Sequence, residues 1–262
     1  IPDIGRGMIL KNFNGVMPSS ENWISVTYGN GKFVAVAFLS SKAAYREDDS
    51  SWKSAIMPSR SYWRSVTYGN GKFVAVADNS STAAAYSEDG ITWTAKTLSS
   101  SKRWFSVTYG NGKFVAVADN STAAAYSEDG VTWTETTLPS SSSWQSVIYG
   151  NGKFVTVASS STAAAYSEDG ITWNAATLPS SADWYSVTYG NGKFVAVAAF
   201  SDRAAYSEDG ITWTAAILPN SENFVTYGNG KFVAVAQDST AAAYSEDGVT
   251  WTSTTMPSSD SW

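Results

Sequence analysis

The apolar positions of this chain fall into short runs separated by turn residues. Residues 63–68 form an aromatic and β-branched run that ends at Gly-Asn-Gly, a sequence that favours a tight hairpin. Residues 72–77 are rich in Phe and Val, which suits burial between sheets. After a polar break, residues 82–86 and 92–98 predict two more strands on either side of Ser-Glu-Asp-Gly. The pattern therefore predicts four antiparallel strands, which we call a, b, c and d.

This four-strand pattern is repeated along the chain. The sequence Tyr-Gly-Asn-Gly-Lys-Phe recurs at intervals of 38 to 41 residues and begins at Tyr28, Tyr68, Tyr109, Tyr149, Tyr189 and Tyr227. A period of this size is typical of propeller and solenoid proteins. We number the repeats unit one to unit six, with approximate bounds 21–58, 59–99, 100–139, 140–179, 180–219 and 220–257.

The repeat predicts an all-β fold, because no segment shows the 3.6-residue period of an amphipathic helix. Four short antiparallel strands per unit suit a closed six-bladed β-propeller with four strands per blade, and a non-closing β-solenoid is the alternative. We expect one domain over residues 1–262. Residues 1–20 precede the first unit and are expected to act as an N-terminal strand at ring closure, so deleting residues 1–17 should lower the melting temperature.

The turn between strands c and d carries a resemblance to a known family. Its sequence, Ser-Glu-Asp-Gly-Ile/Val-Thr-Trp, resembles the Asp box of bacterial neuraminidase-type (BNR) repeats, with one residue fewer between Asp and Gly. Five units match, whereas residues 46–52 of unit one read Arg-Glu-Asp-Asp-Ser-Ser-Trp. The resemblance implies a sialidase-like propeller in which the Asp and Trp of each turn are structural. These residues are Asp89, Trp93, Asp129, Trp133, Asp169, Trp173, Asp209, Trp213, Asp247 and Trp251.

Connections in an up-and-down blade alternate between its two ends, which separates conserved from varied turns within the chain. The a–b and c–d turns are nearly the same in every unit and form what we call the invariant face. The b–c loops and the links from d to the next a differ, and they form the variable face. We expect any ligand site there, because binding residues sit on loops held by a rigid scaffold. The candidates are Arg60, Trp63, Arg64, Arg103, Trp104, Phe105, Tyr185, Phe200 and Arg203. The bland alternatives are solvated loops and, for the Trp residues, core packing.

The resemblance to sialidases does not extend to their catalytic set. That family uses three arginines around a carboxylate, a Tyr activated by a Glu, and an Asp as acid and base. No arginine here lies in a matching motif, and most Tyr residues occupy repeated positions typical of packing. We expect no catalytic residues and no enzyme activity.

Composition narrows the possible partners. The chain has a net charge of −6 and contains no His and no Cys, which disfavours nucleic acid and removes the usual zinc ligands. The Asp of the c–d turn is expected to bond its own backbone rather than calcium. We therefore expect no metal and no cofactor. No apolar run approaches the 18 residues of a membrane span, and no signal peptide is visible.

These features favour a non-catalytic recognition module, which we expect to be a monomer. It would bind a glycan, as a lectin does, or a cell-surface protein, from a secreted, cell-surface or virion-associated location. A sialidase-like glycosidase is one alternative. A purely structural or engineered repeat propeller is the other, because the units are so alike.

Overall fold

The structure, a computed structural model, describes residues 16–47 and 50–257. Regular secondary structure in these residues is entirely β. In units one to three the strands are β1 (Trp23–Gly29), β2 (Lys32–Ala37), β3 (Ser40–Glu47), β4 (Lys53–Ser61), β5 (Trp63–Gly69), β6 (Lys72–Ala77), β7 (Ser81–Ser87), β8 (Thr94–Lys102), β9 (Trp104–Gly110), β10 (Lys113–Ala118), β11 (Ser121–Ser127) and β12 (Thr134–Gly150).

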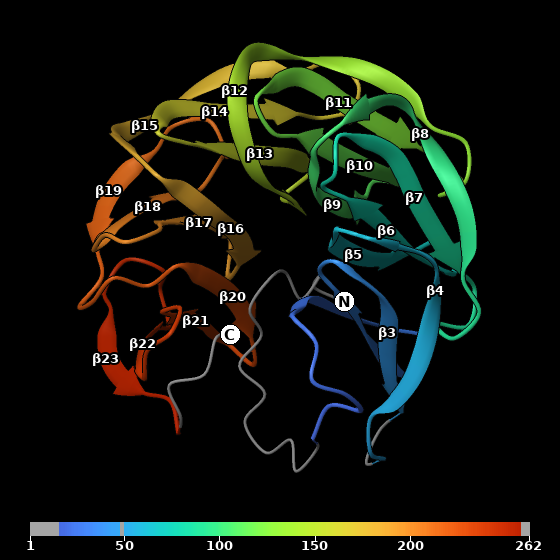
Figure 1. The fold of residues 1–262 in the computed structure, drawn as a ribbon. Helices are drawn as coiled ribbons and strands as arrows, with labels where there is room; N and C mark the ends of the chain where they lie inside the picture. Colours follow the sequence, from blue (N-terminus) through green and yellow to red (C-terminus); the bar gives the residue numbers. More distant parts are fainter. Residues whose placement is uncertain (1–15, 48–49, 258–262) are drawn as a thin grey trace.

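In the rest of the chain they are β13 (Lys153–Ser159), β14 (Ser161–Ser167), β15 (Asn174–Ala182), β16 (Trp184–Gly190), β17 (Lys193–Ala198), β18 (Arg203–Ser207), β19 (Thr214–Ile217), β20 (Phe224–Gly228), β21 (Lys231–Val235), β22 (Ala241–Ser245) and β23 (Thr252–Thr255). Neighbouring strands pair antiparallel in chain order, which confirms the predicted a–b–c–d meander. Figure 1 shows the sheets arranged around a common axis, with the a strands innermost and the d strands outermost. The chain is therefore a β-propeller.

The prediction of six separate four-stranded blades is wrong. Four blades are separate four-stranded sheets, namely β1–β4, β5–β8, β16–β19 and β20–β23. Units three and four instead form one seven-stranded sheet from β9 to β15, because β12 is the last strand of one unit and the first of the next.

The serine-rich link within β12 explains this difference. Ser142 pairs with Ser121 of β11, and its neighbour Ser143 pairs with Ser159 of β13, so one strand passes from the first sheet into the second, with a register shift in its pairing to β11 between Thr137 and Ser142. In the other links the residue before the Trp lies outside both strands, as Arg103 does between β8 and β9. The sequence predicted a link between two strands here, but an extended link can satisfy its backbone groups by pairing on both sides.

The hydrophobic cores lie between units rather than inside them. One core combines Val34 and Met57 of unit one with Trp63 and Phe73 of unit two, and similar cores follow between later pairs of units, although the core between units five and six lacks the Trp that opens strand a. The b strands of units two to five are apolar on both faces because each of their faces meets a neighbouring sheet. Stability therefore comes from unit-to-unit burial, at roughly 1.5–3 kcal/mol for each fully buried large side chain.

Two further contacts join each unit to the next, and we call the pair of them a joint. In the first, a serine hydroxyl near the start of strand a accepts a hydrogen bond from a valine N–H of the next unit. The bonds are Val66 N to Ser25 Oγ, Val107 N to Ser65 Oγ, Val147 N to Ser106 Oγ, Val187 N to Ser146 Oγ and Val225 N to Ser186 Oγ. These lengths are 3.1 to 3.3 Å.

In the second contact, the Gly that ends strand a lies directly under the Tyr ring of the next unit. A Cβ atom placed on Gly29 would lie 2.0 Å from the Tyr68 ring, and Gly190 meets the Tyr227 ring in the same way. No side chain fits in that space, so glycine is needed here for close approach rather than for its backbone freedom.

The innermost strands contact each other in the order β1, β5, β9, β12, β16 and β20, and no comparable contact joins β20 to β1 among the residues described. Figure 1 shows the ribbons of these two sheets apart from each other, and we call the region between them, which no comparable strand contact of the described residues bridges, the opening. The closed ring that the repeat predicted is therefore not seen in this part of the chain. The predicted role of residues 1–15 in closure lies outside the described residues.

Candidate functional site

The contacts at the two ends of the sheets agree with the division into faces. On the invariant face, the a–b turn of one unit reaches the c–d turn of the next, where Asn70 Nδ2 donates to the Glu128 carbonyl at 3.2 Å. On the variable face, the b–c loop meets the link of its own unit, where the Asp78 N–H donates to the Tyr62 carbonyl at 2.9 Å.

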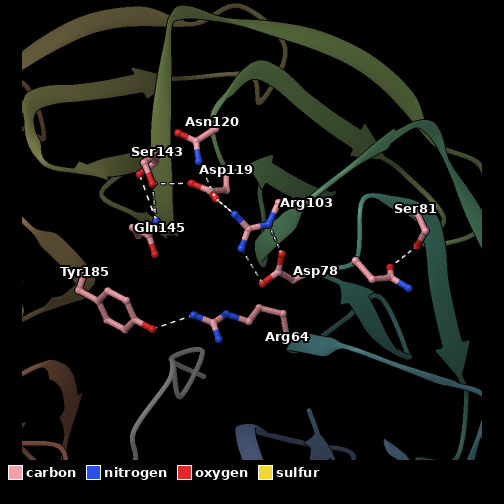
Figure 2. A network of polar contacts seen from close by, with 10 residues as sticks. Arg64, Asp78, Ser81, Arg103, Asp119, Asn120, Ser143, Gln145 and Tyr185 are labelled. Carbon is pink, nitrogen blue, oxygen red and sulfur yellow. Dashed lines mark hydrogen bonds and ion pairs between the residues drawn. The ribbon is translucent and has the colours of Figure 1, made fainter. Parts of the chain in front are cut away.

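A charged cluster on the variable face joins units two, three and four. The Arg103 guanidinium contacts Asp78 at 2.8 Å and Asp119 at 2.6 Å (Figure 2). Ser143 donates a hydrogen bond to Asp119, and Asn120 Nδ2 donates to it at 3.0 Å. Both carboxylates are almost fully buried, whereas the Arg103 side chain is 44% exposed.

Two acids share the Arg103 guanidinium, and the positive charge of Arg64 also acts on Asp78. Burial raises the pKa of Asp78, against the hydrogen bond and positive charge of Arg103. Breaking such a pair leaves a buried charge without compensation. The cluster therefore ties the loops of units two and three to a fixed position.

Next to this cluster, Arg64 reaches across the axis. Its Nη2 donates to the Tyr185 hydroxyl at 2.7 Å, joining unit two to unit five (Figure 2). The Arg64 guanidinium carbon lies 4.5 Å from the centre of the Phe105 ring and 5.8 Å from that of Phe38. Cations lie favourably over aromatic faces at such distances.

Arg64 has no carboxylate within 4 Å among the described residues, and its Nε is buried there without a hydrogen-bond partner. Arg103 differs, since it is neutralised by two acids. The Phe105 ring lies near both arginines, and the Arg103 guanidinium carbon is 5.1 Å from the centre of this ring. An arginine held by aromatic rings and a phenol keeps its positive charge available to an external anion.

The structure thus brings together four of the nine residues proposed from the sequence: Arg64, Arg103, Phe105 and Tyr185. Trp63 and Trp104 are core residues instead, at 1% and 0% exposure, and their Nε1 atoms donate to the Ser59 and Ser100 carbonyls. The repeated Trp opens strand a on the side that packs against the preceding unit, so it cannot stack on a ligand.

The remaining three candidates lie on loops and make local contacts. Arg60 Nε donates to the Leu39 carbonyl at 3.1 Å, and Arg203 Nη1 donates to the Ser181 carbonyl at 2.7 Å. Phe200 is 78% exposed. No contact links them to Arg64 in the described part of the chain.

Sequence reasoning missed the residues that support this site. Asp78 and Asp119 begin the b–c loops of consecutive units, and Arg103 ends the link between these units, so their positions in the repeat were the available signal. Ser143 and Gln145 come from unit four, and Gln145 Nε2 donates to Ser143 Oγ at 2.8 Å. Nothing in the sequence pointed to Ser143 and Gln145 as members of this cluster.

On the invariant face, the c–d turns bond their own backbone as expected. In unit six, Asp247 Oδ1 accepts hydrogen bonds from the Val249 and Thr250 N–H groups at 2.8 Å and from the Ser245 hydroxyl at 2.9 Å. The Thr250 and Val249 bonds lower the pKa of Asp247 to about 2. The same bonds are made by Asp89, Asp129, Asp169 and Asp209.

The Trp that follows each of these turns is Trp93, Trp133, Trp173, Trp213 or Trp251, and its Nε1 is buried without a hydrogen-bond partner in the described residues. These indoles pack in the cores between units, except that Trp251 is only partly buried. Within residues 16–47 and 50–257, no group of three or more potential metal ligands gathers. No helix in the same residues could cross a bilayer.

A model of the family described as "DUF6242 beta propeller domain" matches residues 139–261. No curated protein matches the sequence significantly. The Asp-box resemblance remains a prediction.

Solved structures similar to this chain are propellers of low sequence identity. Virginiamycin B lyase from Staphylococcus aureus has a TM-score of 0.81 at 13% identity, over 92% of this chain and 86% of that chain. YCF48 bound to D1 peptide has a TM-score of 0.70 at 15% identity, over 90% of this chain and 83% of that one. YCF48 from Cyanidioschyzon merolae has a TM-score of 0.69 at 12% identity, over 91% and 86%. These likenesses show a β-propeller fold.

Proposed function

We propose that this propeller is a recognition module that binds an acidic peptide segment at its variable face, with Arg64 as the anchor. The observation that carries the proposal is the setting of the Arg64 guanidinium. It lies between aromatic rings and bonds to Tyr185 of an opposite unit, without a carboxylate partner in the described residues.

The chemistry of this setting favours a carboxylate ligand. Arginine binds carboxylates through paired N–H donors, and the surrounding rings give apolar contact to the rest of a peptide. Tyr185 also packs edge-on against Phe224, with ring centres 5.3 Å apart, which holds the phenol in position. The similar propeller YCF48, solved with the D1 peptide, supports a peptide rather than a glycan as the partner.

A rigid scaffold supports binding without a large change of shape. Arg64 and Tyr185 lie on strands β5 and β16, and the buried Asp78–Arg103–Asp119 cluster fixes the adjacent loops. Sites on strands lose little conformational entropy when a ligand binds.

The test uses a peptide array in which each acidic sequence is paired with its Asn/Gln and C-terminal amide counterpart. Binding of selected peptides is then measured by fluorescence anisotropy for the wild type, Arg64→Gln and Arg203→Gln. We expect Arg64→Gln to weaken binding at least about tenfold, the loss of one charge-assisted contact. Arg203→Gln is the matched control, because Arg203 is also on the variable face but bonds a backbone carbonyl.

Equal binding by wild type and Arg64→Gln, or equal binding of acidic and neutral peptides, would overturn the proposal. A glycan array and a fluorogenic sialoside run in parallel distinguish the other functions. Glycan binding would indicate a lectin, and turnover of the sialoside would indicate a glycosidase.

A further inference from the structure

We infer that the opening between unit six and unit one is a docking surface for one further four-stranded unit of this same repeat. The first observation is Gly228, the last Gly of the series that ends each strand a. A Cβ on each of the five earlier glycines would lie 2.0 to 2.1 Å from a Tyr ring carbon of the following unit, whereas one on Gly228 would have nothing within 4 Å. Unit six therefore keeps a glycine seat for a Tyr ring that no described residue fills.

The second observation lies beside this seat, on the sheet face of unit six. The valine at the third position of strand b is completely buried in the first five units, where a glycine of the next c–d turn covers it, as Gly90 covers Val34. Its counterpart in unit six, Val233, is only partly buried, and so is Trp251. This face thus has the residues of an internal joint without the covering unit.

On the opposite side of the opening, residues of unit one are also less buried than their counterparts in other units. In unit one, Trp23, Val26 and Phe33 are only partly buried, although their counterparts in units two to five are buried. These three residues pack with Trp52 in a cluster whose members, among the described residues, come from unit one and the preceding Met17. On one side of the opening lies the face of unit six that, in earlier units, contacts the following unit. On the other side lies the face of unit one that, in later units, contacts the preceding unit.

The residues on the facing surfaces of units six and one indicate that a complete unit would fit between them. In the internal joints the glycine that ends strand a is covered by a Tyr ring of the next unit, and the valine of strand b is covered by a glycine of the next c–d turn. Residues 1–15 contain no Tyr and no Ser-Glu-Asp-Gly sequence. Unit one does contain Tyr28, but the sequence has Asp49 where the other units have the covering glycine, and a Cβ at that position in unit two would lie 2.7 Å from Val34. Only another regular unit carries both elements.

The docked unit would lack one contact of an internal joint. Phe224 stands where the earlier units have the serine that accepts the next valine N–H. A unit held by packing alone, without this inner hydrogen bond, binds more weakly than the internal ones do to each other.

The experiment adds a seventh unit to the same polypeptide, after the last residue. A second copy of residues 185–219 is added after Trp262, where the sequence Pro-Ser-Ser-Asp-Ser-Trp already provides a link and the first residue of strand a. Gly228→Ala and Gly190→Ala are then compared in the original and the extended chain by differential scanning calorimetry. We expect the extended chain to melt several degrees higher. Gly228→Ala should leave the original chain unchanged but lower the melting temperature of the extended chain, while Gly190→Ala lowers it in both.

Two results would overturn the inference. If Gly228→Ala already lowers the melting temperature of the original chain, its own residues fill the seat. If Gly228→Ala is silent in both chains, the added unit does not dock. Hydrogen exchange followed by mass spectrometry gives a second measurement that does not depend on the variants. Rapid exchange throughout the added strands, with units one to six protected, would also contradict docking.

Discussion

The carboxyl group of Glu222 is fully buried in the link that leads into β20. Asn220 Nδ2 donates to its Oε1 at 3.2 Å, and its Oε2 has no partner among the described residues. Burial raises the pKa of Glu222 above its ordinary value of 4.5, and the bond from Asn220 only partly opposes this. Burial disfavours the ionised carboxylate, and this effect outweighs the hydrogen bonds from the Asn220 side chain and from the Glu222 and Asn220 backbone.

Replacing Glu222 with Gln should therefore stabilise the protein near neutral pH by about 1–2 kcal/mol, since the neutral amide avoids burial of a charge. The folded state holds its proton more tightly than the unfolded state, so wild-type stability falls as pH rises from 4.5 through the raised pKa. Urea unfolding between pH 4 and 8 measures this. Glu135→Gln, at an exposed position, is the control, and an unchanged pH dependence in Glu222→Gln would contradict the prediction.

For single residues, the sequence indicated which side chains could bind a ligand but not which other side chains surround them. Symmetry-breaking positions on strand a, such as Arg64 and Tyr185, did meet at one point. The adjoining Trp63 and Trp104 did not, because side chains alternate between faces along a strand and these two face the core. Asp78 and Asp119 were visible as charges, but only three-dimensional packing puts Arg103 between them.

The c–d turn is the element that repeats most faithfully. In unit three, Asp129 Oδ1 accepts from the Val131 and Thr132 N–H groups at 2.8 Å, and Ser127 Oγ accepts from the Gly130 N–H at 2.8 Å. Burial acts to raise the pKa of Asp129, but the bonds from Thr132 and Val131 outweigh it and lower the pKa to about 2. The ionised carboxylate therefore holds the turn together.

Asp129→Ala should lower the free energy of unfolding by about 1–2 kcal/mol, the loss of hydrogen bonds to a charged acceptor. Glu128→Ala, one residue earlier and exposed, should have little effect. The stability from Asp129 is present above its ordinary pKa of 3.8 and is lost as pH falls toward about 2, so the two proteins should converge in acid. Equal denaturation midpoints at pH 7 would refute this.

Strand positions and hairpins were predictable because each unit alternates apolar runs with Gly and Asp turns. The joining of units three and four was not. Ser142 and Ser143 have the same composition as a loop, and their pairing with β11 and β13 depends on two neighbouring sheets being in place. A local pattern cannot show that a link has partners on both sides.

The whole molecule is a chain of joints, each linking only consecutive units. Such arrays gain stability from nearest-neighbour interfaces more than from one common core. The Ser106 hydroxyl is a central example, because it accepts the Val147 N–H at 3.1 Å across the boundary inside the seven-stranded sheet. We therefore expect that a substitution at one joint weakens the contact between its two units without weakening the other joints.

Ser106→Ala should lower stability by about 1–3 kcal/mol, because the buried Val147 N–H loses its partner. Ser59→Ala, at an exposed position, is the control. Amide exchange should accelerate first at Val147 and at its neighbours in β12 and β9. Uniform acceleration through all units would instead indicate a single cooperative core.

Repetition has a consequence for folding. The Gly29–Tyr68 contact and the Gly190–Tyr227 contact are chemically the same. These contact surfaces therefore do not distinguish one unit from another. Only the covalent succession of the polypeptide decides which unit follows which. A nascent chain can therefore pair correct surfaces in a wrong order, and the shortness of the links between consecutive units is what favours the right sequence of assembly.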